Sequence, residues 1–480
     1  MTSEELATEN EQLRAENTVL KRRLTELEAL VKELQAQLEA ALRAGKRQAA
    51  PFSKGAPKPE PKTPGRKVGH PAAQRPKPQK VDRVEEASLP SQCPGCGGPV
   101  VEDKVDVQYQ VDIPPVQPVV TEFHVHVGHC EACQRRLQGH HPQQTSDALG
   151  AAGVQLGPRA LTLAADAKHE LGVPYGKISR WFDSAFGLSV CRAAWARADQ
   201  RLARRGAPVY LKLIDVLRQS HSVAVDETGW KVRGQLAWLW VFTDKAATVY
   251  LIDPTRAHAV VEWVLGEDFA GVLQCDCFLA YDPLAYDQQK CLQHLLRRCD
   301  ALLESKSRRA VVFSRQVASL LRGAIHLKHR LQDQQISPEG FRIARGKLAA
   351  ALDRLLAGHY TDPDNAKLAK LLRKHRSRLL VFLENDAVAP TNARAEQEIR
   401  PAVVVRKTSA CNRSPTGAAT HAILTSLIRT CRRQGQSFLA LGLALWCRTP
   451  LPLPKALRPR LKAPAPEVLP AIALPQMSTR

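Results

Sequence analysis

Two acidic residues in the second half of the sequence stand where carboxylates could meet. Asp226 ends a short, β-branched apolar run, and Asp276 ends a second such run that follows two further strand patterns and a helical one. The order strand, strand, strand, helix, strand is that of a ribonuclease-H-like sheet, in which the ends of the first and fourth strands are neighbours. Adjacent carboxylates repel each other unless a cation lies between them. We therefore expect Asp226 and Asp276 to share a divalent ion, Mg²⁺ or Mn²⁺.

A third carboxylate would allow two ions to be held about 4 Å apart, one activating an attacking oxygen and the other stabilising a leaving oxygen. Glu396 is the candidate, because it follows Thr391, an expected helix N-cap, and shares a helix face with Arg400. Glu398 lies on a different face and is expected to be dispensable. Each acid alone is more simply a capping or surface carboxylate. Their joint placement predicts a metal-dependent phosphoryl-transfer site.

Four of the twelve cysteines form two Cys-x-x-Cys pairs, Cys93 with Cys96 and Cys130 with Cys133. Four thiolates arranged as a tetrahedron make a closed, structural zinc site. A redox role is the alternative, but redox pairs rarely come as a matched set of two. We predict a zinc-binding domain over residues 86–140, with strands in the apolar stretch at residues 105–127.

The 480-residue chain has 69 Lys and Arg against 47 Asp and Glu, which gives a net charge of +22. Such a protein seeks polyanions, and DNA is the first candidate. An acidic membrane surface is a less favoured partner. The longest apolar run, residues 438–447, has about half of the ~20 residues needed to span a bilayer. The first residues show no secretory signal. We expect a cytoplasmic, nucleoid-associated bacterial protein.

Residues 1–45 show a heptad pattern. Apolar residues recur alternately at spacings of four and three, which predicts a coiled coil, and Asn10 and Asn17 at a positions favour a parallel homodimer. An amphipathic helix packed on its own domain is the alternative. The other residues of the pattern are Leu6, Leu13, Leu20, Leu24, Leu27, Val31, Leu34, Leu38 and Ala41.

The next segments suit contact with nucleic acid. Residues 46–85 form a basic, Pro-rich linker in which Arg66 and Lys67 either contact DNA phosphates or are simply solvated. Residues 141–217 have helical periodicity, and the pattern around Gly187 fits either a helix-turn-helix DNA reader or ordinary helical packing.

The fold class is therefore multidomain α+β, with a catalytic domain at residues 218–430 and a C-terminal helix and Pro-rich tail at residues 431–480. Residues 285–385 should be an all-helical insertion, with helices near 291–303, 310–331, 338–356 and 365–383. Its basic residues would line a DNA channel, although half of them could belong to a solvated face. They are Arg297, Arg298, Lys306, Arg308, Arg309, Arg322, Lys328 and Arg330.

Together these features resemble transposases of the insertion sequence 66 family over nearly the whole chain. The resemblance implies a DDE transposase in which Asp226, Asp276 and Glu396 ligate two Mg²⁺ ions while transposon ends are cut and joined to target DNA. It also implies phosphate contacts by Arg400, Arg406 and Lys407. The sequences that carry it are DETGW at 226–230, Asp276 with Ala280 and Tyr281, CLQH at 291–294 with Arg297 and Arg298, NARAE at 392–396 with IRP at 399–401, PFSKG at 51–55, PGRKVGH at 64–70, the heptads and the cysteine pairs.

This chain departs from the family pattern at Cys277, Phe278, Ala393 and Gln397, and none of these changes removes an expected metal ligand. Gln397 replaces an arginine that could contact phosphate. Two alternatives remain: a zinc-containing DNA-binding protein that has lost catalysis, and a ribonuclease-H-like nuclease without strand transfer. Helper proteins encoded by the same element are potential further partners.

Overall fold

The computed structural model describes residues 3–46 and 75–447. The chain divides into two compact units, Met1–Asp112 and Ile113–Arg480. The arm with Arg66 and Lys67 and the C-terminal tail lie outside the described residues. Within the described ranges, no helix combines the length and the apolar character needed to cross a membrane.

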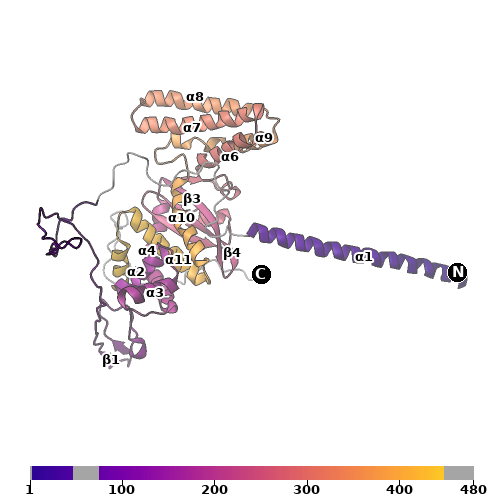
Figure 1. The fold of residues 1–480 in the computed structure, drawn as a ribbon. Coiled ribbons are helices and arrows are strands. Elements are labelled where there is room, and N and C mark those ends of the chain that lie inside the picture. Colours follow the sequence, from indigo (N-terminus) through magenta and orange to yellow (C-terminus); the bar gives the residue numbers. More distant parts are fainter. Residues whose placement is uncertain (1–2, 47–74, 448–480) are drawn as a thin grey trace. The chain divides into compact units, whose positions relative to one another are not determined.

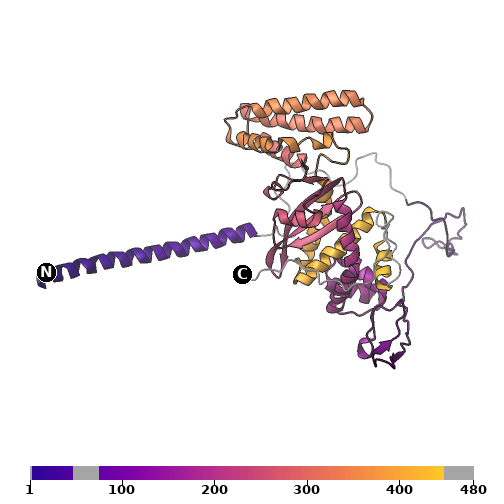
Figure 2. The same ribbon diagram turned by 180° about the vertical axis from the view of Figure 1, so that it is seen from behind.

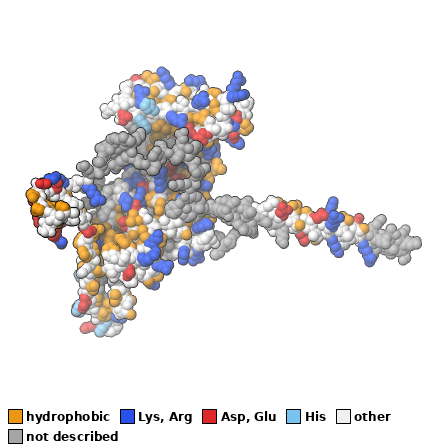
Figure 3. Space-filling view, in the orientation of Figure 1, with side chains coloured by type: hydrophobic (Ala, Val, Ile, Leu, Met, Phe, Trp, Pro, Cys, Tyr) orange, Lys and Arg blue, Asp and Glu red, His pale blue; other side chains and the backbone are white. Residues whose placement is uncertain are grey.

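The first unit contains one long helix, α1 (Ser3–Lys46). The heptad residues whose side chains are described are exposed: Leu13, Leu20 and Leu24 each have more than half of their surface open to solvent. Hydrophobic and charged side chains are interspersed along the helix (Figure 3). An apolar seam that is exposed along its described residues favours pairing with another helix.

Both cysteine pairs adopt the same tight turn. In the first unit, Cys93 N–H donates to Gly98 O and Gly97 N–H donates to Cys93 O, at 2.9 and 2.8 Å. In the second unit, Cys130 and Gln134 make the equivalent bonds at the same two distances. Gly97 and Gln134 take the left-handed backbone that this turn requires, with φ of 73° and 57°.

The strands expected at residues 105–127 are absent, and this prediction was wrong. The only regular structure near them is a short hairpin of β1 (Val127–His129) and β2 (Arg136–Gln138), which presents the second cysteine pair. Val119 and Val120 are 90% and 92% exposed. Apolar β-branched residues form a strand only when a neighbouring strand or core receives them, and the prolines in this stretch remove ladder donors.

The rest of the second unit is mixed α and β (Figures 1 and 2). Its strands are β3 (Ser222–Val232), β4 (Gln235–Thr243), β5 (Thr248–Asp253), β6 (Val272–Cys275) and β7 (Gln288–Lys290). Its helices are α2 (Pro158–His169), α3 (Tyr175–Phe186), α4 (Arg192–Arg218), α5 (His258–Leu265), α6 (Leu292–Ser305), α7 (Val312–Gln332), α8 (Pro338–Ala357), α9 (Pro363–Lys374), α10 (Ala393–Ser409), α11 (Pro415–Arg433) and α12 (Phe438–Cys447).

The five strands form one sheet in the order β5-β4-β3-β6-β7. β3, β4 and β5 are antiparallel neighbours, whereas β6 runs parallel to β3 and β7 runs parallel to β6. The strands predicted around Asp226 and Asp276 are thus present, and their carboxyl ends point the same way.

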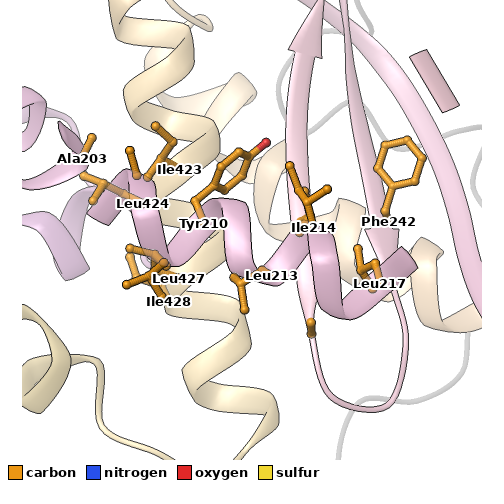
Figure 4. Packing of buried hydrophobic residues seen from close by; sticks show 14 of the residues in the cluster. Ala203, Tyr210, Leu213, Ile214, Leu217, Phe242, Ile423, Leu424, Leu427 and Ile428 are labelled. Carbon is orange, nitrogen blue, oxygen red and sulfur yellow. The ribbon is translucent and has the colours of Figure 1, made fainter. Parts of the chain in front are cut away.

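Alternate residues of the sheet serve two different cores, as strand geometry requires. Val223 and Val225 join the core that α4 and α11 share. Figure 4 shows part of this core, with Ile214 of α4 and Ile423 of α11. Ala224 and Leu239 join a smaller core against α10. The sheet therefore holds α10, with Glu396 in its first turn, over one face.

Helices α6 to α9 form a separate layer with a hydrophobic core of their own (Figures 1 and 2). The layer follows β7 in the chain and precedes α10, so it is inserted between the sheet and the helix that carries Glu396. The last of the four helices is shorter than expected: α9 ends at Lys374, and the chain continues through two single turns, Arg376–Arg378 and Val381–Leu383.

Candidate active site

Asp226 and Asp276 occupy matching positions on adjacent parallel strands. Ser222 pairs with Val272 and Ala224 with Gln274, an offset of 50 residues that also relates 226 to 276. Adjacent strands are about 4.8 Å apart, so the two carboxylates stand side by side where β6 ends. The prediction that Asp226 ends its strand was wrong, because β3 continues past it to Val232, paired with β4.

Burial and neighbouring acids act on Asp226. Burial is the largest cause that raises the pKa of this carboxyl to about 7, and the charges of Glu227, Asp276 and Glu396 add to it. One opposing contact, Glu227 N–H donating to Asp226 Oδ1 at 3.0 Å, lowers the pKa. The fold thus brings Asp276 and Glu396 within electrostatic reach of Asp226, whose surroundings penalise its charge.

Glu227, the next residue, is neutralised by the protein itself. Arg256 Nε donates to Glu227 Oε1 at 2.8 Å, and the Tyr281 hydroxyl donates to Glu227 Oε2. Burial raises the pKa of Glu227, and these two donors lower it. Because its charge is already paired, Glu227 supports the site and is a poor candidate for a metal ligand.

Glu396 is brought to the same edge by Asn392, which is the N-cap of α10 in place of the predicted Thr391. Asn392 Nδ2 donates to Val225 O at 2.6 Å, next to Asp226 on β3. Asn392 N–H donates to Cys291 Sγ at 3.1 Å. A one-residue shift of the cap therefore fastens the start of α10 to both β3 and the start of α6.

Two side chains of α6 face Glu396. His294 Nδ1 is 3.7 Å from Glu396 Oε1, and Arg297 Nη2 is 3.4 Å from Oε2. Glu396 Oε1 and His294 Nδ1 are both buried and have no hydrogen-bond partner. Cys291, His294 and Glu396 place their ligand atoms within 4.8 Å of one another.

Glu398 is not the passive carboxylate that the sequence suggested. It is 5% exposed, and it accepts from Arg429 Nε at 2.7 Å and from Arg433 Nη2 at 2.5 Å. The Tyr250 hydroxyl donates to the Glu398 backbone carbonyl at 2.6 Å. This buried ion-pair cluster joins α10 to α11 and β5, so Glu398 is structural.

The basic residues near the acids fall into two groups. Arg298, Arg400 and Lys407 are exposed, as is more than half of the Arg297 side chain. Arg406 is half-buried and donates to Thr228 Oγ1 at 2.9 Å, so it anchors α10 to β3. Its contact with phosphate remains a prediction.

The proposed DNA channel in the helical layer also divides. Lys328 is buried and pairs with Asp386 at 2.6 Å, which contradicts its place in a channel. Lys306 pairs with Asp362 and Asp364, and Arg322 with Asp300. The sequence shows these positive charges but not the acidic partners that the fold brings to them. Arg308 and Arg309 are exposed and stay candidates for DNA contact.

Two family models match the parts of the chain that carry these residues. The model of the transposase IS66 family matches residues 153–420, and that of the zinc-finger binding domain of transposase IS66 matches residues 90–134. The chain belongs to the transposase IS66 family. The resemblance seen in the sequence is confirmed, and the second match supports zinc binding in the segment that holds the cysteine pairs.

A curated relative carries no established activity. The chain is 24% identical over 286 residues to the uncharacterized protein y4jD of Sinorhizobium fredii (strain NBRC 101917 / NGR234), a match that covers 52% of this chain and 55% of the relative. The chain thus spans about half the length of that curated relative.

Proposed function

We propose that this member of the transposase IS66 family is a DDE transposase that binds transposon ends and catalyses DNA cleavage and strand transfer. The observation that carries the proposal is the convergence of Asp226, Asp276 and Glu396, two from neighbouring parallel strands and one from α10, around a carboxyl group with a raised pKa. The strand order supports a ribonuclease-H-like description of the core.

The donor set fits the divalent ions that the family implies. The three acids offer only oxygen atoms, which Mg²⁺ and Mn²⁺ prefer. Burial is the largest cause that raises the pKa of Asp226, and the charges of Glu227, Asp276 and Glu396 add to it; a cation among the carboxylates would offset this repulsion. When bound, two such ions activate the attacking oxygen and stabilise the leaving oxygen of a phosphodiester.

Hydrogen bonds from the backbone hold the carboxylates of Asp226 and Asp276. Backbone N–H groups of Glu227 and Phe278 donate to one oxygen of Asp226 and one of Asp276, at 3.0 and 2.9 Å. These contacts restrain the orientation of each carboxylate. The Arg256 and Tyr281 contacts on Glu227 prevent that acid from adding a further uncompensated charge.

DNA would lie along the exposed basic residues beside the acids. Arg297, Arg298, Arg400 and Lys407 offer charge to phosphates near the scissile bond, and Arg406 would act from its partly buried position. Arg66 and Lys67, which lie outside the described residues, would also bind phosphates. Neutralising phosphates releases counterions, so binding should weaken steeply as salt rises.

A second basic surface lies between α3 and the start of α4. A hollow of about 730 Å³ there is lined by Lys177, Arg180 and Arg192. Trp181 on α3 is 43% exposed, while Ile178 and Phe182 hold the helix against the core. We propose that α3 contacts end DNA in the manner of a helix-turn-helix reader.

Two further segments would stabilise and dimerise the protein. Cys93, Cys96, Cys130 and Cys133 would hold one structural Zn²⁺, and the exposed heptad seam of α1 would pair two copies of the chain as a parallel coiled coil. We place the protein in the bacterial cytoplasm with the nucleoid, acting on transposon ends and target DNA, with helper proteins of the same element as potential partners.

The test is incubation of the purified chain with a labelled end-containing duplex and a target plasmid in Mg²⁺ or Mn²⁺. The proposal expects cleaved ends that become joined to the plasmid. Cleavage without joining would favour a ribonuclease-H-like nuclease. Binding without cleavage in either metal would favour a DNA-binding protein that has lost catalysis.

A further inference from the structure

Glu396, one of the three acids, also belongs to a second cluster, whose other potential metal ligands are a cysteine and a histidine. Cys291 precedes α6, His294 is in its first turn, and Glu396 approaches from α10. A buried sulfur, a ring nitrogen and a carboxylate oxygen lie within 4.8 Å of one another. Mg²⁺ selects oxygen donors, whereas sulfur and imidazole ligands suit Zn²⁺ and other late first-row ions.

The distance between the His294 and Glu396 side chains is too long for a hydrogen bond and leaves room for an ion. His294 Nδ1 and Glu396 Oε1 are 3.7 Å apart, beyond hydrogen-bond range. Metal–nitrogen and metal–oxygen bonds of about 2.1 Å that meet at a tetrahedral angle separate their ligands by about 3.4 Å. Both atoms are buried without a partner, and such orphan groups are costly unless something satisfies them.

We propose that Cys291, His294 and Glu396 form a transition-metal site of the zinc type, distinct from the Cys-x-x-Cys pairs. Such an ion would bind Glu396 through Oε1 and fix the orientation of that side chain. Oε2 would keep its contact with Arg297 Nη2, which is 3.4 Å away. Since Glu396 is also the third acid of the proposed catalytic set, the role of this ion in catalysis rests on the proposed function, but its binding does not.

Binding must displace a proton from Cys291. Burial raises the pKa of this thiol, while backbone N–H groups, Asn392 first, and then His294 and Gln293, lower it. A metal ligand must be a thiolate.

Cobalt(II) provides the test, because a cobalt–thiolate bond absorbs strongly in the near ultraviolet. The full chain is first loaded with one equivalent of Zn²⁺ to occupy the Cys-x-x-Cys pairs, and Co²⁺ is then titrated. The same titration is made on Cys291→Ser, on His294→Ala and on the control Cys299→Ser, whose buried sulfur lies on α6 away from Glu396. Circular dichroism checks that each variant is folded.

The proposal expects a saturable cobalt–thiolate band in the parent and in Cys299→Ser. Affinity should fall by at least about 100-fold in the other two variants, because even groups in a metal's outer shell are worth 10–100-fold. An equal band in all four proteins, or no band beyond the zinc-loaded background, overturns it. His294→Ala keeps the test decisive if Cys291→Ser does not fold. Cobalt binding without DNA cleavage would refute the proposed function alone.

Discussion

The pKa of Asp226 makes a quantitative prediction for Asp226→Asn. In the unfolded chain this acid has its ordinary pKa of 3.8, and in the folded chain burial and the neighbouring acids raise it to about 7. A raised pKa means that the folded state binds the proton more tightly. The stabilisation is therefore complete below pH 3.8 and is lost as the pH rises through about 7.

The magnitude follows from the two values. Losing the proton across this window costs the folded state about 4 kcal/mol, at 1.36 kcal/mol per pKa unit, as an upper value because solvent screens part of it. Asparagine cannot ionise, so without divalent ions Asp226→Asn should unfold at a higher temperature than the parent at pH 8. At roughly 2 to 4 °C per kcal/mol for a domain of moderate size, the difference is at most about 8 to 16 °C and should vanish near pH 4.

Divalent ions should make the parent melt at a higher temperature than Asp226→Asn. Mg²⁺ at a hundredfold excess over its Kd would stabilise the parent by about 2.7 kcal/mol and the variant by much less. The assay is calorimetric melting from pH 4 to pH 8, with EDTA or Mg²⁺, and Asp268→Asn is the control at an exposed acid outside the site. A variant that melts below the parent at every pH, or a parent whose melting temperature ignores Mg²⁺, would refute the reasoning.

Three further predictions concern the supports of the site. Glu398→Gln should destabilise the fold by about 3 kcal/mol, because Arg429 and Arg433 lose their buried partner; a melting temperature within 2 °C of the parent, roughly the shift expected from less than 1 kcal/mol, would contradict this. Leu20→Pro should break α1 and halve the mass measured by light scattering; an unchanged mass would show that α1 does not mediate dimerisation. Cys96→Ser should lower the zinc content by one ion per chain, measured by atomic absorption, and an equal zinc content would show that Cys96 is not a ligand.

The carboxylates at the strand ends could be predicted from the sequence because their signals are local. Alternating or continuous apolar runs mark strands, and the order of elements places their ends. Asp226 and Asp276 therefore lie on neighbouring strands as expected. The failed strands at residues 105–127 show the limit of that signal, since strand residues need a partner that composition does not supply.

The partners of the acids could not be predicted, because they come from distant parts of the chain. Arg256 and Tyr281 reach Glu227 from different elements, and Arg429 reaches Glu398 from α11. Helical periodicity shows that Glu396 and Glu398 face different ways, but not that α11 covers the second face with arginines. The CLQH sequence at 291–294 was used only for the family resemblance, although its Cys-x-x-His spacing also allows both side chains to ligate one metal ion.

Strand transfer by matched variants tests the central claim most directly. Asp226→Asn, Asp276→Asn and Glu396→Gln each remove one carboxylate with little change in volume, and Glu384→Gln is the control at an exposed acid outside the site. Each protein is assayed for binding to a labelled transposon end and for joining of that end to a target plasmid in Mg²⁺. The account predicts that all four variants bind the end at least as tightly as the parent, and that only the parent and Glu384→Gln join it. Joining at the parental rate by any of the three site variants would contradict the account.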